Sequence, residues 1–451
     1  MKTTFKPLYL LLLIGGLFSC TKLEFTPENA VSADELFKTK TDFKLVLNTA
    51  YDKFANQMNS NVPAMNELLA DNIYPVNLST EYGVVYKRAT FKFRTGNCFD
   101  LYTTIYHCNV VIEKLKTEDV GFTEAEKAEL DAEARFIRAW SHWEMVKLYA
   151  QPFGYTKDNS HPGIPLRTNS DYKVELRSSV AKVYTFLVDE LKAIENNLAD
   201  VSPYHATKWS AKALLAKIYF QMHDYTNALT YCNEVINNSG LKLSDSLNRI
   251  LPGGEVEHIF AINSTQSNNK SNAITSNYRS DANPNPSFRA AKDLALMVVG
   301  SDSDRRKKFF KLNNPGKPSE AYVFTRYNKD FFDIPLLHLT DIVLMRAECY
   351  FYAGQKQKGY DDLMMIRKRS YGAGNRTFDY NAANLQDSIQ YERRIEMATE
   401  GDRLNQLRRL GSEGKSILIR NAPWDCPGMV LQFGNAFTTS GFIFNEEGGC
   451  N

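Results

Sequence analysis

The 451-residue sequence lacks most of the short signatures by which enzymes and metalloproteins are identified. It has no C-x-x-C pair, no H-E-x-x-H motif and no G-x-S-x-G elbow, which argues against a zinc or thiol-redox centre, a zinc hydrolase and a serine-hydrolase triad. It also lacks a charge imbalance, because 54 Lys and Arg oppose 52 Asp and Glu for a net charge of +2. Nucleic-acid binding needs a clustered basic face. The sequence therefore predicts no metal, no cofactor and no nucleic-acid partner.

Long apolar runs are also scarce, and the first one stands at the start of the chain. It extends from Leu8 to Phe18, follows two lysines and ends at Ser19-Cys20. A membrane-spanning helix needs about 20 residues, so this run is too short to remain in the bilayer. A basic start, a short apolar stretch and a small residue before the cleavage point are typical of a secretory signal.

The residues at the end of that run resemble a bacterial lipobox, Leu17-Phe18-Ser19-Cys20. We therefore expect residues 1–19 to be a lipoprotein signal peptide, Cys20 to be lipidated, and residues 20–32 to be a tether to outer-membrane lipid. Two or more acyl chains hold a protein stably to a bilayer. The alternative is an ordinary cleaved signal that leaves Cys20 as a free or paired thiol. No second run approaches spanning length, so we expect the rest of the chain to lie outside the bilayer.

Helical periodicity dominates the rest of the sequence. Apolar residues recur at helical spacing over 33–54, 101–115, 123–149 and 180–198. The longest of these helices begins with a capping box of Thr123 and Glu126. Residues 207–237 predict two helices joined at Met222-His223-Asp224, with small residues at their crossing, and this pair resembles a tetratricopeptide repeat of about 34 residues. A weaker copy covers 341–366.

Two segments interrupt the helical pattern, one near 66–96 and one near 240–330. Both are polar or aromatic and show little periodicity, and the second is too long for a simple connector. The predicted fold class is therefore mainly α: tetratricopeptide-repeat-like helix pairs with long irregular loop insertions, in a single domain over 33–451.

Seven cysteines accompany this pattern. Cys232 and Cys349 stand inside apolar helical stretches and are predicted to be buried thiols. The exported location permits disulfides, so Cys98 with Cys108, and Cys426 with Cys450, are candidate bridges.

The two insertions also contain the candidate ligand residues. Sugar rings stack on aromatic side chains, and their hydroxyl groups need carboxylate, amide or guanidinium partners, a mixture typical of small-ligand sites. Local packing of a long loop is the alternative explanation for each tyrosine. The candidates are Asp71, Asn72, Tyr74, Tyr82 and Tyr86 in the first insertion, and Asn277, Tyr278, Arg279 and Phe288 in the second.

Two further patterns could suggest chemistry. Glu392, Glu396 and Glu400 share one helical face, as paired acid-base carboxylates could, but many arginines crowd the same segment, and we favour mutual ion pairing that joins helices. The stretch 411–416 resembles a phosphate-binding loop, but it is two residues too short and follows a helix where a strand is required. We expect it to be a turn, and we expect no catalytic residue.

Several segments, taken together and in order, resemble the SusD/RagB family of surface lipoproteins. The first segment is the lipobox with Leu23 and Pro27, and the second combines 134–140, 148–154 and 163–166. Asp304-Arg305-Arg306 follows. The next segment combines 334–337, Asp341, 344–348 and 367–369, and the last combines 392–393, 396, 400–403 and 407–409. Leu404 stands where the family often has tryptophan, Gln406 where it often has aspartate, and Met364 where asparagine is usual. The tail also lacks the usual proline-rich ending.

The resemblance implies a non-catalytic protein on the outer face of the outer membrane. It implies capture of an oligosaccharide, or of a peptide, and pairing with a SusC-like TonB-dependent transporter that receives the ligand. A different class stays open: a helical-repeat lipoprotein that serves as a scaffold for outer-membrane assembly.

Overall fold

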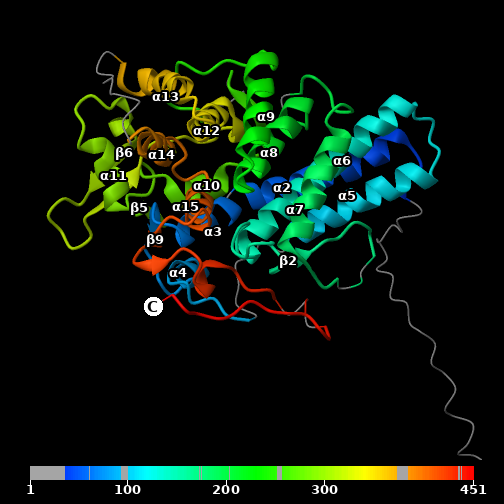
Figure 1. Cartoon of the computed structure of the whole chain (residues 1–451), viewed down its shortest axis with the longest axis horizontal. Helices are drawn as coiled ribbons and strands as arrows, with labels where there is room; N and C mark the ends of the chain where they lie inside the picture. Colours follow the sequence, from blue (N-terminus) through cyan, green and yellow to red (C-terminus); the bar gives the residue numbers. More distant parts are fainter. Residues whose placement is uncertain are drawn as a thin grey trace, which may run out of the picture.

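The computed structural model describes residues 36–59, 61–92, 100–171, 173, 175–202, 204–250, 256–372, 384–434, 437 and 439–450. The signal, Cys20 and the tether lie outside these residues. The fold is mainly α (Figure 1). The helices are α2 (Lys40–Met58), α3 (Asn61–Leu69), α4 (Glu81–Tyr86), α5 (Asp100–Thr117), α6 (Glu124–Tyr149), α7 (Val180–Ile194), α8 (Lys208–Gln221), α9 (Tyr225–Asn238), α10 (Asn272–Tyr278), α11 (Lys292–Val299), α12 (Leu339–Tyr352), α13 (Lys356–Tyr371), α14 (Leu385–Glu396) and α15 (Arg403–Ser412), with 3-10 turns η1 (Arg305–Phe309) and η3 (Pro427–Met429).

The strands are short and form small antiparallel sheets. The largest sheet has four strands in the order β1-β5-β7-β6, and the others are two-stranded, β2-β3, β4-β8 and β9-β10. Their bounds are β1 (Ile73–Pro75), β2 (Pro162–Pro165), β3 (Arg177–Ser179), β4 (His258–Ile262), β5 (Phe288–Ala290), β6 (Phe310–Asn313), β7 (Ala321–Phe324), β8 (Ile334–His338), β9 (Leu418–Ile419) and β10 (Ala422–Pro423).

Helix α6 is the central helix of the fold. It begins with the predicted capping box, in which the Glu126 amide donates to Thr123 Oγ1 over 3.2 Å and the Thr123 amide donates to Glu126 Oε2 over 2.8 Å. Its second half is buried on every side, from Phe136 to Met145. A helix that is buried all round belongs in the core, and α6 packs against α2, α5 and α7.

The two predicted helix pairs are confirmed, and they turn in the same way. The α8–α9 turn has His223 at φ +62°, and the α12–α13 turn has Gly354 at φ +73°. In each turn the next residue, Asp224 or Gln355, donates its amide to a carbonyl five residues earlier, at 3.0 and 2.8 Å. A left-handed residue just past a helix end satisfies carbonyls that the helix leaves unpaired.

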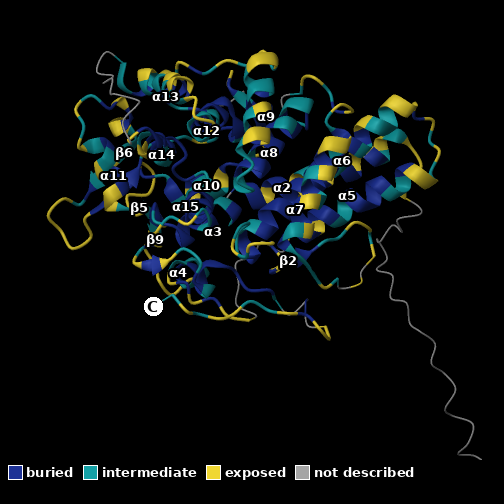
Figure 2. Cartoon of the chain, in the orientation of Figure 1, coloured by how far each residue is buried: buried dark blue, intermediate teal, exposed yellow. Residues whose placement is uncertain are grey.

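The pairs also stack on each other. Helix α12 packs against α9 as well as α13, and Tyr225 lies parallel to Tyr352 with ring centroids 3.9 Å apart. Arg346 pairs with Asp362 in its own pair and donates to Asn233 Oδ1 in the other. The inner faces of these helices are buried and their outer faces are exposed (Figure 2). Such units bury their apolar faces only by stacking, and this arrangement fits the tetratricopeptide-like prediction.

The prediction of an irregular first insertion was wrong in its detail. Residues 66–96 include the end of α3, all of β1 and all of α4. Thr80 begins α4 by accepting a hydrogen bond from the Gly83 amide at 3.3 Å. The sequence conceals this helix because it has fewer than two turns, too few to show a period.

The second insertion supplies β4 to β7 with α10 and α11, so it too is more regular than expected. The two insertions meet, because Ile73 to Pro75 of β1 pair with Ala290 to Phe288 of β5. Segments far apart in the sequence thus form one sheet beside the helical body.

One predicted disulfide is confirmed and the other is wrong. Cys426 is bonded to Cys450 with an S–S distance of 2.03 Å. Cys108 is a buried free thiol in α5, and Cys98 lies outside the described residues. Cys232 and Cys349 are buried thiols, as predicted.

Over the part of the chain that the structure describes, no helix is long and apolar enough to cross a membrane.

Candidate functional site

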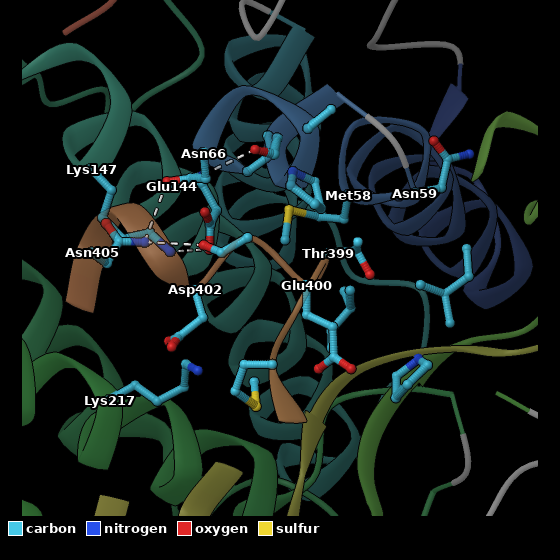
Figure 3. A pocket seen from close by; sticks show the side chains of 18 of the residues that line it. Met58, Asn59, Asn66, Glu144, Lys147, Lys217, Thr399, Glu400, Asp402 and Asn405 are labelled. Atoms are coloured by element: carbon cyan, nitrogen blue, oxygen red, sulfur yellow. Dashed lines mark hydrogen bonds and ion pairs between the residues drawn. The ribbon is translucent and has the colours of Figure 1, made fainter. Parts of the chain in front are cut away.

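A cavity of about 1100 Å³, measured with its open mouth, lies among the helices of the described structure. We call it the central cavity (Figure 3). It lies where the end of α2, α3, α6, α8, α10, β8 and the α14–α15 turn converge. Several members of its lining are half-buried, among them Pro63, Gln221, Ile274 and Leu336, so the cavity is open to solvent.

Aromatic side chains form much of the wall. Trp140 and Trp143 come from α6, Phe220 from α8, and Tyr278, Tyr327 and Phe332 from the second insertion. Tyr327 donates to or accepts from the Thr399 hydroxyl. The Tyr278 hydroxyl, in contrast, hydrogen-bonds to no other described residue, and burial raises its pKa well above the usual value. It is therefore a neutral hydroxyl available to a ligand.

The α6 side of the cavity carries an acid–base pair. Glu144 Oε1 accepts from Trp140 Nε1 at 3.0 Å and from Lys147 Nζ at 2.8 Å. The Lys147 ammonium also lies 3.7 Å from the centre of the Trp143 ring. Burial lowers the pKa of Lys147, and the charge of Glu144 partly offsets this effect. The α6 groups therefore hold one another in fixed positions and present polar atoms to the cavity.

A second charged group stands where α8 meets the α14–α15 turn. Lys217 pairs with Asp341. Arg393 joins Asp341 to Asp402, with its guanidinium 2.7 Å from a carboxylate oxygen of each. Figure 3 shows Lys217 and Asp402 on the same side of the hollow. The polar groups of this side are thus cross-linked between helices before any ligand binds.

The α14–α15 turn forms part of the wall in a strained conformation. Thr399 has φ +73°, a region that β-branched residues rarely adopt. Gly401 has φ +77°, and a Cβ there would lie 2.9 Å from the Cα of Pro63. The Gly401 amide donates to Glu67 Oε1 at 3.0 Å, and burial raises the pKa of Glu67 to about 8. Strain of this kind persists only where the surroundings fix it, and it is frequent at ligand sites.

Amide side chains complete the lining, and three of them are asparagines. Asn405 donates to Asn66 Oδ1 at 3.3 Å, which joins α15 to α3. Asn59, at the end of α2, donates to the Lys270 carbonyl at 2.9 Å. These amides retain donor and acceptor capacity, so the cavity combines aromatic faces with hydrogen-bonding groups.

Behind Glu400 lies what we call the arginine cluster. Arg249 donates to Glu396 at 2.9 Å and to Glu400 at 2.7 Å. The other members are Arg306, Arg369, Asp304, Glu257 and Glu392, all less than a tenth exposed. Burial raises the pKa of Glu396 and Glu400, but the neighbouring arginines outweigh this effect and hold both values well below the usual range.

The ion-pairing interpretation of the three glutamates is confirmed, although their partners are not the arginines expected from the nearby sequence. Arg393, Arg394 and Arg403 turn to Asp341, Asp402 and Asp71 instead. Residues 411–416 comprise the last two residues of α15 and the turn that follows them, so the predicted turn begins two residues later than expected.

Of the nine candidate ligand residues, Tyr278 is the one that lines the central cavity. Phe288 and Asn72 are at most 1% exposed, and this burial argues against direct ligand contact. Phe288 packs edge-on against Tyr82 and Tyr278 with centroid distances of 4.8 and 5.3 Å. The structure therefore brings candidates from both insertions together, but as a packed aromatic cluster.

The other candidates fix neighbouring segments. Asp71 accepts from Arg403 Nε at 2.7 Å, and Asn72 Oδ1 accepts from Arg394 Nε at 2.9 Å. Tyr86 lies 4.0 Å under the Arg420 guanidinium. Arg279 pairs with Asp281 and Asp330 at the surface. Tyr74 is half-buried opposite Arg289, and Asn277 is half-buried on α10. Their proposed ligand roles stay predictions.

Sequence reasoning missed most of the cavity wall. Trp140, Trp143, Glu144, Lys147 and Lys217 line the cavity but are not among the candidate ligand residues predicted from the sequence. The signal that could have found them is the placement of Glu144 and Lys147 one turn apart on a helix whose neighbours are buried. Charged residues are almost never fully buried unless they are paired. Within the described residues, no group of three His, Cys, Asp or Glu could hold a metal ion.

The fold and the cavity define a class of helical binding proteins, and comparison with known families identifies the class. A family model described as "Starch-binding associating with outer membrane" matches residues 23–220, and the SusD family model matches residues 306–426. The two models together cover more than two thirds of the chain. The chain belongs to the SusD/RagB family.

Relatives agree with this assignment. A SusD-like protein of Formosa agariphila is 25% identical over 260 residues, which are 52% of this chain and 46% of the relative. The matches span about half, or less, of the length of the curated relatives. A SusD superfamily protein of Bacteroides vulgatus has a TM-score of 0.78 at 18% identity, over 91% of this chain and 99% of that one. A laminarin-binding SusD-like protein has a TM-score of 0.72 at 18% identity over the same shares. These two structures show the fold.

Proposed function

We propose that this protein is a non-catalytic binding protein that captures oligosaccharides at the outer membrane and passes them to a TonB-dependent transporter. The central cavity carries the proposal, because it combines aromatic faces, amides and charged groups in one concave site. The starch-binding description of the family and the laminarin-binding neighbour support a glycan as ligand.

The state of the cavity carboxylates supports binding without chemistry. Glycoside hydrolysis needs one carboxylic acid and one carboxylate placed across the scissile bond. Here Glu144 accepts from Trp140 and Lys147, Asp402 is held by Arg393, and Glu400 by Arg249 and His338. All three carboxylates are thus engaged in fixed ion pairs or hydrogen bonds, and Glu400 has its pKa held below the usual range.

The test is binding of the soluble form, residues 21–451, to a glycan panel with a peptide pool beside it. We expect saturable glycan binding that weakens about twofold to tenfold in Tyr278→Phe, because one ligand hydrogen bond is lost. Tyr155→Phe, at a tyrosine that lies outside the cavity lining and is 43% exposed, is the matched control. Binding of peptides alone would change the ligand class, and the absence of any glycan binding would refute the proposal.

Anchoring and partnership need separate tests. Cys20→Ala is expected to release the protein from the membrane fraction, because the acyl chains supply the membrane affinity. Retention of that variant in the membrane would contradict lipidation as the anchor. Co-purification of a transporter barrel with the wild-type protein would support the handover of ligand, whereas co-purification of an assembly machine would favour a scaffold.

A further inference from the structure

A second hollow lies beside the central cavity along helix α2. It has a volume of about 530 Å³, is more open than the central cavity, and we call it the α2 groove. Phe54 and Ala55 are buried members of its lining, and Tyr51 and Tyr204 are half-buried ones. Its lining consists of Asn48, Tyr51, Asp52, Phe54, Ala55, Tyr204, Phe260, Ala261, Ile262, Asn263 and Lys270.

The two tyrosines of the groove are held in place by their hydroxyl groups. Tyr51 donates to Glu133 Oε2 at 2.7 Å and accepts from the Ala206 amide at 2.9 Å. Tyr204 donates to Asp333 Oδ2 at 3.2 Å. Both rings are half-buried. Because their hydroxyl groups are already fixed, the two rings would lose little side-chain entropy when a ligand contacts their apolar surfaces.

The rim of the groove is polar. Asn48 and Asn263 are exposed, and neither amide side chain hydrogen-bonds to another described residue. Asp52 pairs with Lys270, and Lys270 also donates to Asn56 Oδ1 at 3.1 Å. The groove thus presents the same two kinds of group as the central cavity, aromatic surfaces and hydrogen-bonding side chains, at an accessible position.

Three elements contribute neighbouring residues to both hollows. Helix α2 lines the groove with Asp52 and Ala55 and lines the cavity with Met58 and Asn59. These positions recur at helical spacing on one face, and Asp52 to Asn59 span about 10 Å of helix. The paired strands β4 and β8 place Ile262 in the groove and Ile334 in the cavity, directly opposite each other.

The third element, residues 270–274, also contributes to the linings of both hollows. Lys270 lines the groove, Ile274 lines the cavity, and the Lys270 carbonyl accepts from the Asn59 side chain. The Asn59–Lys270 hydrogen bond therefore joins a residue that lines the cavity to one that lines the groove.

We propose that the α2 groove and the mouth of the central cavity form one elongated site, in which the groove binds the additional sugar units of a longer oligosaccharide. This inference rests on the proposed function. It assigns Tyr51 and Tyr204 to stacking against sugar rings, and Asn48, Asp52 and Asn263 to their hydroxyl groups. The groove then makes affinity depend on the length of the ligand.

The test measures binding of short and long oligosaccharides by calorimetry. The probes are α-1,4- and β-1,3-glucan oligosaccharides of two units and of six units or more. Tyr204→Ala is expected to weaken binding of the long ligand about tenfold, and to change binding of the disaccharide less than twofold. Tyr278→Phe, in the cavity, is expected to weaken both. Tyr155→Ala is the matched control.

A milder variant tests whether a loss of binding could come from misfolding. Asn263→Ala changes an exposed side chain that bonds to no other described residue, so its thermal unfolding is expected to match that of the wild type while it shows the same length-dependent loss. If both groove variants bind long and short ligands as the wild type does, the elongated site is refuted and the proposed function stands. If no oligosaccharide of any length binds the wild type, both fall together.

Discussion

The arginine cluster and the central cavity share Glu400, and both are crowded with charged groups, but they differ in how those groups are used. In the cluster, Arg249, Arg306 and Arg369 are bound on several sides by carboxylates. In the cavity, polar groups with spare capacity face an open space, as Tyr278 does. Density of charge therefore does not mark a binding site here. The site that we propose is distinguished instead by unused hydrogen-bonding capacity beside aromatic surfaces.

The most severe way to test this contrast is to break the arginine cluster. Glu396→Gln removes the carboxylate that Arg249, Arg306 and Arg369 share. We expect a loss of about 3–5 kcal/mol in the free energy of unfolding, because buried cations are left without their anion. Urea denaturation followed by circular dichroism measures it. Lys40→Met, at the exposed pair with Glu126, should leave the midpoint nearly unchanged. Equal effects would show that the cluster is not structural.

The wall of the cavity can be tested at Gly401. Gly401→Ala combines a left-handed φ with a contact of 2.9 Å to the backbone of Pro63, so we expect a loss of about 3 kcal/mol. Gly354 is the matched control, because its φ is +73° and nothing lies within 4 Å of its Cβ position. Gly354→Ala should cost about 1 kcal/mol, from the backbone alone. Thermal unfolding of both variants measures the difference between their stability losses. Similar losses would mean that Pro63 moves away from the added Cβ at little cost.

The carboxyl group behind that wall predicts a pH dependence. Burial raises the pKa of Glu67 to about 8 from a usual value of 4.5. Folding therefore favours the protonated form, and the contribution of Glu67 to stability falls as the pH rises from about 4.5 to about 8. Glu67→Gln keeps an acceptor for the Gly401 amide and cannot ionise. We expect it to be more stable than the wild type at pH 8 and equal near pH 5, by urea denaturation at both values. If the difference in stability between Glu67→Gln and the wild type were the same at both pH values, Glu67 would have its ordinary pKa in the folded protein.

The smallest expected effect is a difference in stability between variants of two tyrosines in the cavity wall. Tyr327 shares a hydrogen bond with Thr399, whereas the Tyr278 hydroxyl bonds to no other described residue. Tyr327→Phe should lower the free energy of unfolding by about 1 kcal/mol, and Tyr278→Phe should leave it nearly unchanged. In glycan binding we expect Tyr278→Phe to show the loss. If Tyr278→Phe destabilised the fold and left binding intact, its hydroxyl would belong to the structure and not to the site.

Local sequence patterns predicted the helical framework well, for reasons visible in single elements. The Thr123–Glu126 capping box fixed the start of α6, and the apolar spacing on each side of 222–224 predicted α8 and α9. Both signals act between residues a few positions apart. The same reasoning failed at α4, which is too short to show a period, and at Cys108, for which a disulfide was expected but which is a free thiol.

What the sequence determined by itself is the class of fold, the helix pairs and the ion pairing of Glu392, Glu396 and Glu400. Only the tertiary structure decided where the candidate site lies and which residues line it. The walls of the central cavity come from α2, α3, α6, α8, α10, β8 and the α14–α15 turn, and Tyr278 reaches it while Phe288, ten residues later, is packed away. Helical and strand periods specify which face of an element is apolar. They do not specify which faces meet, because that depends on the packing of elements far apart in the chain.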